Sequence, residues 1–127
     1  MIFPFNSKSG LIVIPTRLLG PNGDVVIRLA LDTGATESMV NWNIIVLLGY
    51  DPAAVSERIR LTTGSGVEFV PQINISEAQA LHMIRKNFPI LCHTLPPSAT
   101  VDGVLGLDFF RDHRLELDFR KGQLIVS

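Results

Sequence analysis

Two apolar runs near the start of the chain predict a pair of antiparallel strands. The runs cover residues 11–19 and 24–31, and the turn-forming segment Gly20-Pro21-Asn22-Gly23 separates them. Pro15 cannot donate a backbone hydrogen bond, so the first strand is expected at a sheet edge or at a bulge. The second strand ends at Asp32, and we therefore expect this acid to lie in apolar surroundings.

One short helix is expected after this hairpin. Asn41 is a suitable N-cap for a helix that begins at Trp42 and ends near Leu48, and Gly49 is a typical helix stop. Asp51-Pro52 is a second start signal, sufficient for one helical turn.

A second hairpin is predicted in the middle of the chain. Residues 57–63 and 67–75 have the composition of strands. The segment Gly64-Ser65-Gly66 between them suits a tight tip, because glycine accepts a positive φ. Residues 76–86 are ambiguous, because Ser76, Glu77 and two alanines favour a helix start locally.

Short elements with frequent turns fill the rest of the chain. The predicted strands are residues 87–94, 101–105, 115–119 and 124–126, and a short helix is predicted over residues 107–113. Many short strands and little helix indicate a mostly β, barrel-like domain.

Composition narrows the class of protein. The 127 residues suit one domain, and a net charge of −1 gives no reason to expect nucleic acid or an anionic membrane as partner. The single cysteine, Cys92, cannot form an internal disulfide, which fits a reducing compartment. No signal peptide is apparent, and no apolar run approaches the ~20 residues of a membrane helix. We therefore expect a soluble, cytoplasmic protein.

Two motifs carry a resemblance to a known family. Residues 29–36 read Leu-Ala-Leu-Asp-Thr-Gly-Ala-Thr, which resembles the active-site motif of aspartic proteases; taken alone, it is also compatible with a plain strand-to-turn junction. Residues 101–110 look like the other family signature, two apolar residues and a glycine before a short helix. With both motifs in the family's order, the chain is most similar to the small, single-lobe, retropepsin-like aspartic proteases of bacterial type.

The resemblance implies an aspartic endopeptidase. It implies one retropepsin-like aspartic protease domain over residues 1–127, a mostly β acid-protease barrel with one or two short helices that is active as a two-fold homodimer. Its substrate is a peptide or protein, and no cofactor is expected.

The number of motifs bears on the oligomeric state. Peptide hydrolysis by carboxylates needs two of them on one water, one ionised and one protonated. The chain has one Asp-Thr-Gly, because the segments at Asp102, Asp108 and Asp118 lack the hydroxyl residue and the turn. We therefore expect the second carboxylate to be Asp32 of a second copy, across a two-fold axis.

Roles follow for the residues of the first motif. Asp32 is the expected acid and base, and Gly34 allows the turn and the close approach of two such loops. Ala35 leaves room for substrate. By resemblance, Thr33 hydrogen-bonds across the axis.

The second hairpin and the second motif also acquire roles from the resemblance. Thr63, Gly64, Ser65 and Gly66 occupy the place of the flap that closes over bound peptide, although an ordinary surface hairpin is the alternative. The resemblance favours strands over residues 76–86. The segment expected to pack beneath the catalytic loop is Val104, Leu105 and Gly106.

The chain departs from the retroviral relatives at two positions. They have a second acid where this chain has Thr36, the last residue of the predicted active-site loop, and an arginine that pairs with it where this chain has Leu107. In the family the chain termini add strands to the dimer interface; here Phe3, Phe5 and residues 124–126 are apolar enough for that, or for packing within one chain.

Other functions are less favoured. His82, His93, His113 and Cys92 match no familiar metal-ligand spacing, so no metal is expected. A catalytically silent, dimeric peptide-binding module of the same fold remains an alternative, as does a structural domain in which Asp32 only caps a turn.

Overall fold

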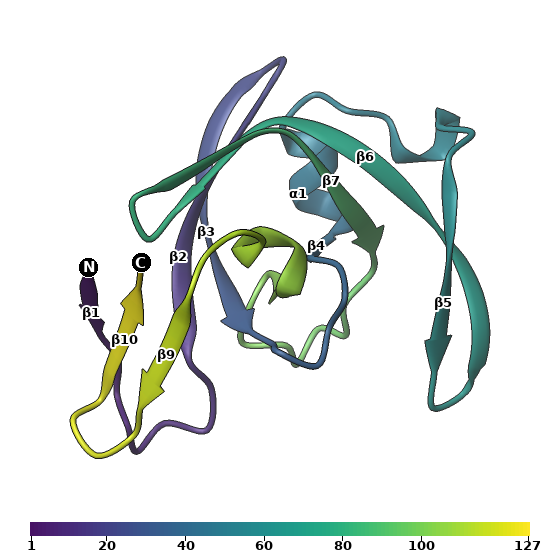
Figure 1. Ribbon diagram of the computed structural model, residues 1–127. Helices are drawn as coiled ribbons and strands as arrows, with labels where there is room; N and C mark the ends of the chain where they lie inside the picture. Colours follow the sequence, from purple (N-terminus) through teal and green to yellow (C-terminus); the bar gives the residue numbers. More distant parts are fainter.

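The two ends of the chain lie side by side in a small sheet. In this computed structural model, which describes the backbone of residues 1–127 and every side chain except that of Thr63, β1 (Ile2–Pro4) pairs with β10 (Gln123–Val126). β10 also pairs with β9 (Leu115–Asp118), so the sheet order is β1-β10-β9 (Figure 1). The terminal strands are therefore paired within one chain.

The first predicted hairpin is confirmed. β2 (Val13–Gly20) pairs antiparallel with β3 (Gly23–Leu31) along its whole length, and Gly23 has the positive φ of a turn residue, +120°. β2 also pairs with β6 (Gly66–Ala80), but only over residues 17–19. Pro15 lies before the segment of β2 that pairs with β6. No strand pairs with Pro15 on that side, so its missing N–H costs no hydrogen bond there.

Two three-residue strands complete the centre of the main sheet. β8 (Gly103–Leu105) lies between β3, to which it is parallel, and β4 (Met39–Asn41), to which it is antiparallel. A Cβ atom on Gly103 would lie 2.0 Å from the Met39 carbonyl oxygen. Only glycine permits this close approach of β4 to β8.

The predicted helix follows β4. α1 (Trp42–Leu47) begins directly after Asn41, as predicted. The Asn41 side chain, however, makes no capping hydrogen bond. Gly49 follows with a φ of +98°. The second start signal yields the single turn η1 (Pro52–Ala54), where the Asp51 carboxylate accepts a hydrogen bond from the Ala53 amide.

The middle of the chain forms two successive hairpins. β5 (Arg58–Thr63) pairs with the first part of β6, and β7 (Met83–His93) pairs with the rest of it. The strands favoured for residues 76–86 are therefore correct, and residues 87–93 continue the same strand. The β6–β7 turn uses Leu81 and His82 with φ values of 53° and 60° in place of glycine.

These strands form a mostly β barrel. The order of the main sheet is β2-β3-β8-β4-β7-β6-β5, and the β2–β6 pairing closes it. Figure 1 shows the β5–β6 hairpin extending on the side of the molecule opposite the terminal sheet. The helix predicted over residues 107–113 is only a short 3₁₀ segment, η2 (Leu107–Phe110). Among the described residues, no helix is long and apolar enough to cross a membrane.

Candidate active site

A tight turn at the end of β3 holds Asp32. The Asp32 amide donates to the Leu105 carbonyl of β8 at 3.0 Å, which extends the parallel ladder by one residue. The Asp32 carbonyl then accepts from the Ala35 amide at 3.1 Å, and its carboxylate oxygen Oδ1 accepts from the Gly34 amide at 2.9 Å. The side chain of Asp32 therefore stabilises the turn that presents it.

The expected apolar surroundings of Asp32 are not found in the single chain. Asp32 is exposed, as are Thr33 and Gly34, whereas Ala30 is buried. The alternation of buried and exposed positions along β3 ends with the strand, and the turn projects beyond the packed sheet. The carboxylate therefore stays in water, where an unpaired charge has no desolvation cost.

Gly34 is not needed for its backbone conformation in the turn, but for the space that its missing side chain leaves. Its φ is not positive, so any residue could adopt its backbone conformation. A Cβ atom there would lie 3.2 Å from Asp32 Oδ1, closer than ordinary van der Waals contact. The glycine thus keeps space around the carboxylate.

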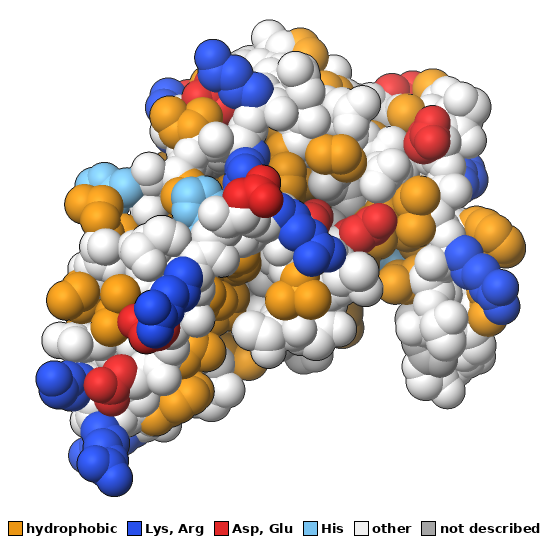
Figure 2. Space-filling model, viewed as in Figure 1, with side chains coloured by type: hydrophobic (Ala, Val, Ile, Leu, Met, Phe, Trp, Pro, Cys, Tyr) orange, Lys and Arg blue, Asp and Glu red, His pale blue; other side chains and the backbone are white. Residues whose placement is uncertain are grey.

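Asp32 lies at an open cleft of about 650 Å³. One wall is the turn and β4, including Ala35, Thr36 and Glu37; the other wall is β5, through residues 59–62. Figure 2 shows the gap between the β5–β6 arm and the body of the molecule. The larger apolar side chains that line the cleft are Met39, Ile59, Leu61, Leu91 and Val104.

Of the predicted flap residues, Gly64, Ser65 and Gly66 do not line this cleft. Gly64 and Ser65 form the two-residue tip of the β5–β6 hairpin, and Gly66 has a positive φ of 134°, as the glycine pattern predicted. The side chain of Thr63 lies outside the described residues. In the single chain, the strand β5 borders the cleft and the tip does not.

Two of the three predicted support residues, Leu105 and Gly106, contact the turn. Leu105 is buried and holds the Asp32 amide. A Cβ atom on Gly106 would lie 2.8 Å from the Ala35 carbonyl oxygen, so glycine is needed for this contact. Val104 differs from the expectation, because it lines the cleft and is only half-buried.

A buried serine that sequence reasoning missed links the two motifs. The Ser38 hydroxyl donates to Asp108 Oδ1 at 2.7 Å and accepts from the Gly106 amide at 2.9 Å, and the Ser38 amide donates to Asp108 Oδ2 at 2.9 Å. Ser38 has no exposed surface. No local signal marks this pair, because the two residues are 70 positions apart in sequence.

Ser38 and Asp108 lie close in sequence to Thr36 and Leu107, the two positions at which the chain departs from the retroviral relatives. Thr36 is exposed, and the Leu107 amide donates to the Ala35 carbonyl at 2.9 Å. Backbone hydrogen bonds and the side chains of Ser38 and Asp108 therefore join the Asp-Thr-Gly turn to the second motif. Hydrogen bonds to a carboxylate are about twice as strong as neutral ones, so the link is firm.

Glu37 is the second acid that lines the cleft. Its carboxylate oxygen Oε2 is covered from solvent and has no hydrogen-bond partner among the described residues. An unpaired buried acceptor is uncommon, and it makes Glu37 the residue to compare with Asp32 in any test of the chemistry.

The histidines and the cysteine lie apart from the cleft. His93 pairs with Glu68 at 2.8 Å, and burial raises the pKa of the Cys92 thiol to about 11. Within the described part of the chain, no three His, Cys, Asp or Glu residues are grouped so that they could hold a metal ion.

Two solved structures of aspartic protease type are similar to this chain in fold. A retropepsin-like aspartic protease from Rickettsia conorii matches with a TM-score of 0.74 and 20% identity, covering 99% of this chain and 88% of that one. The retroviral protease-like domain of Ddi1 from Leishmania major matches with a TM-score of 0.56 and 18% identity, covering 94% and 90%. These structures share the retropepsin-like fold, and no curated protein matches the chain. The family model for the gag-polyprotein putative aspartyl protease matches residues 21–112, more than half of the chain, which therefore belongs to this family.

Proposed function

We propose that the protein is an aspartic endopeptidase that works as a homodimer, with Asp32 of each copy acting on one water. The supporting observation is the state of the Asp32 carboxylate at the open cleft. Oδ1 accepts the Gly34 amide, whereas Oδ2 has no hydrogen bond to any described residue and is available to a water molecule. The turn thus holds the acid in one orientation while leaving one oxygen for chemistry.

The chemistry assigns different protonation states to the two acids. The ionised carboxylate takes a proton from the water, whose oxygen attacks the peptide carbonyl carbon. The protonated carboxylate donates its proton to the carbonyl oxygen. When the tetrahedral intermediate collapses, the carboxyl that took the water's proton gives it to the amine nitrogen and the C–N bond breaks. The other carboxylate takes back the hydroxyl proton, so the pair again holds one proton. Two close carboxylates share one proton, so cleavage should follow a bell-shaped pH profile that belongs to the pair.

The cleft supports a peptide as substrate. Its five larger apolar side chains offer contacts for apolar residues of the peptide, and strand β5 of the β5–β6 hairpin borders the open side as part of a lid would. In this proposal Thr33 links the two turns across the axis, and Thr36 borders the bound peptide backbone.

Asp32→Asn tests the acid, with Glu37→Gln as its matched control. Both changes turn a carboxylate at the same cleft into an amide. Loss of an acid–base residue costs about 10²–10⁴-fold in rate, so Asp32→Asn should abolish cleavage of a peptide library without dissociating the dimer. Glu37→Gln should keep most of the activity. An Asp32→Asn protein that cleaves at the wild-type rate would contradict the proposal, and loss of activity only in Glu37→Gln would point to that acid instead.

Mixing the two proteins tests whether both copies contribute. With a tenfold excess of Asp32→Asn chain at exchange equilibrium, about a tenth of the wild-type chains would remain in wild-type pairs. Activity per wild-type chain should fall in the same proportion. Unchanged activity would mean that one chain suffices. A dimer that binds peptides without cleaving them would favour the binding-module alternative.

A further inference from the structure

The 3₁₀ segment η2 contacts the catalytic turn at two points. At its start, the Leu107 amide donates to the Ala35 carbonyl of the turn at 2.9 Å. One residue later, the Asp108 carboxylate accepts the Ser38 hydroxyl at 2.7 Å and the Ser38 amide at 2.9 Å. The position of the turn therefore depends on what holds η2 in place.

Arg85 of β7 holds the other end of η2. Its Nε and Nη2 atoms donate to the Phe109 carbonyl at 3.0 and 2.9 Å, and Nη2 also donates to the Arg111 carbonyl at 2.6 Å. The last carbonyls of a helical segment lack partners within the segment, and a cationic side chain can satisfy them. One guanidinium group thus bridges two carbonyl groups at the end of η2.

The Phe109 ring gives the guanidinium a further contact. Arg85 Cζ lies over this ring, 5.9 Å from its centre, within the range of a cation–π interaction. Phe109 has no exposed surface, and its ring packs edge to face against Phe88 and Phe110 with centroids 5.7 and 5.5 Å apart. A planar, forked guanidinium suits such combined contacts, whereas a lysine ammonium is a point charge.

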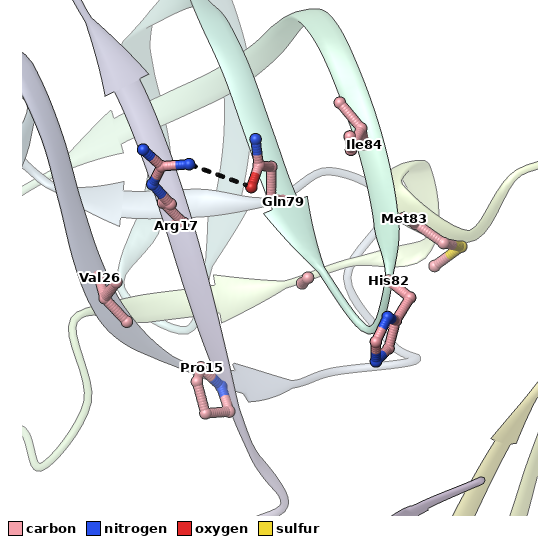
Figure 3. Close-up of a pocket in the computed structure, with 8 residues that line it drawn as sticks. Pro15, Arg17, Val26, Gln79, His82, Met83 and Ile84 are labelled. Atoms are coloured by element: carbon pink, nitrogen blue, oxygen red, sulfur yellow. Dashed lines mark hydrogen bonds between the residues drawn. The ribbon is translucent and has the colours of Figure 1, made fainter. Parts of the chain in front are cut away.

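The strand separates Arg85 from its two neighbours. Successive residues of a strand point to opposite faces, and Ile84 and Lys86 are exposed whereas Arg85 is half-buried. Ile84 lines a hollow of about 390 Å³ between β2, β3 and the β6–β7 hairpin (Figure 3). Lys86 thus carries the same charge as Arg85 on the opposite face of β7, which makes it a matched control.

We propose that Arg85 is a positioning residue for the reaction at Asp32 and that it acts through η2. The inference rests on the proposed function. Arg85 fixes the end of η2, and Leu107 at the start of η2 holds the Ala35 carbonyl. The Ala35 amide in turn donates to the Asp32 carbonyl at 3.1 Å. Loss of the guanidinium should therefore let η2 shift and move the turn with it.

A residue in this role affects the chemical step more than substrate binding. Arg85 is not among the described residues that line the cleft, so its loss removes no contact to a peptide bound there. Misplacement of reacting groups by about 1 Å can cost about 100-fold in rate. We therefore expect kcat to fall while KM stays near the wild-type value.

Arg85→Met and Arg85→Lys test the proposal, with Lys86→Met as the matched control. Methionine keeps an apolar stem and removes the guanidinium, whereas lysine keeps the charge without the fork. Under conditions where each protein is folded and dimeric, kcat should fall about 10- to 100-fold in Arg85→Met and less in Arg85→Lys. KM should stay within about twofold, and Lys86→Met should cleave as wild type does.

Amide hydrogen exchange gives a second readout that does not depend on cleavage. The Ala35 and Leu107 amides form the backbone bonds within the turn and between the turn and η2. In Arg85→Met these two amides should exchange faster by a larger factor than the amides of the β2–β3 hairpin, which report on the stability of the whole fold. An equal factor at both places would mean that Arg85 only stabilises the protein, and would overturn the proposal.

The outcomes distinguish this inference from the proposed function. If Asp32→Asn is inactive and Arg85→Met has the wild-type kcat, the positioning role is wrong and the paired-Asp32 mechanism stands. If the wild-type chain does not cleave, the proposed function is wrong. The exchange of the Ala35 and Leu107 amides then decides alone whether Arg85 holds the turn.

Discussion

Removal of the Ser38 hydroxyl should destabilise the protein more than its small size suggests. Ser38→Ala deletes the hydroxyl's 2.7 Å bond to the Asp108 carboxylate and leaves the buried Gly106 amide without an acceptor. A hydrogen bond to a charged group contributes about 1.5–3 kcal/mol, and an unsatisfied buried donor costs about 1–3 kcal/mol. Because the two terms overlap at one site, we expect a loss of about 3 kcal/mol in the free energy of unfolding.

Equilibrium urea unfolding at fixed protein concentration measures this loss. The matched control is Ser76→Ala, since the Ser76 hydroxyl lies 3.1 Å from the Tyr50 hydroxyl at an exposed position. Surface substitutions usually change stability by less than about 0.5 kcal/mol, and the control should fall in that range. A Ser38→Ala protein as stable as the control would refute the reasoning.

Activity gives a second readout of the same change. The Ser38 network fixes Gly106, which in turn contacts the Ala35 carbonyl of the catalytic turn. Displacement of Asp32 by about 1 Å can cost about 100-fold in rate, so kcat should fall more than KM rises at temperatures where the variant is folded. An unchanged kcat would mean that the network stabilises the fold without positioning the acid.

Four further predictions concern three positions, Gly103, Cys92 and His82. Gly103→Ala should prevent folding or cost more than about 3 kcal/mol, because its Cβ would lie 2.0 Å from the Met39 carbonyl; soluble expression and circular dichroism check this, and wild-type stability would contradict it. Cys92, 1% exposed, should resist thiol reagents at pH 8 until the chain unfolds, and rapid labelling of the folded protein would contradict its burial. Burial raises the pKa of the Cys92 thiol from its ordinary 9.0 to about 11, so between these pH values the unfolded thiol has lost a proton that the folded thiol still holds. The free energy of unfolding should therefore fall between pH 9 and 11 more in wild type than in Cys92→Ala, and equal slopes would contradict the shift. His82→Gly should stabilise the β6–β7 turn by up to about 1 kcal/mol, since His82 has a φ of 60°, less whatever its ring contact with Phe3 contributes; clear destabilisation in urea would contradict this.

Local patterns predicted the hairpins and the helix well. The alternation along residues 11–31, broken by Gly20-Pro21-Asn22-Gly23, corresponds to β2 and β3, and the glycines at the second tip correspond to the β5–β6 turn. The structure of residues 76–86 was harder to predict from sequence. Leu81 and His82 adopt left-handed backbone conformations in the turn, and neither residue type is typical of that conformation. The pairing of β6 with β7 overrides the local helix preference there.

The candidate site was predicted in part. The Asp-Thr-Gly turn and its contact with Leu105 and Gly106 were expected from the two motifs, and the structure has both. The solvent exposure of Asp32 was not expected, because apolar neighbours in sequence do not reveal whether any element covers the end of a strand. In one chain, none of the described elements buries it.

Residue order by itself determined the strands, the turns and the position of the acid, because these depend on neighbours a few residues apart. Only the tertiary structure brought Ser38 to Asp108, Glu37 to the wall of the cleft, and Phe119 beside Leu11 and Thr33. Ser38 and Asp108 are 70 positions apart in sequence, and Leu11 and Phe119 lie near opposite ends of the chain. They form because the parallel pairing of β3 with β8 and the closure of β10 on β1 bury apolar surface that no local segment can bury alone.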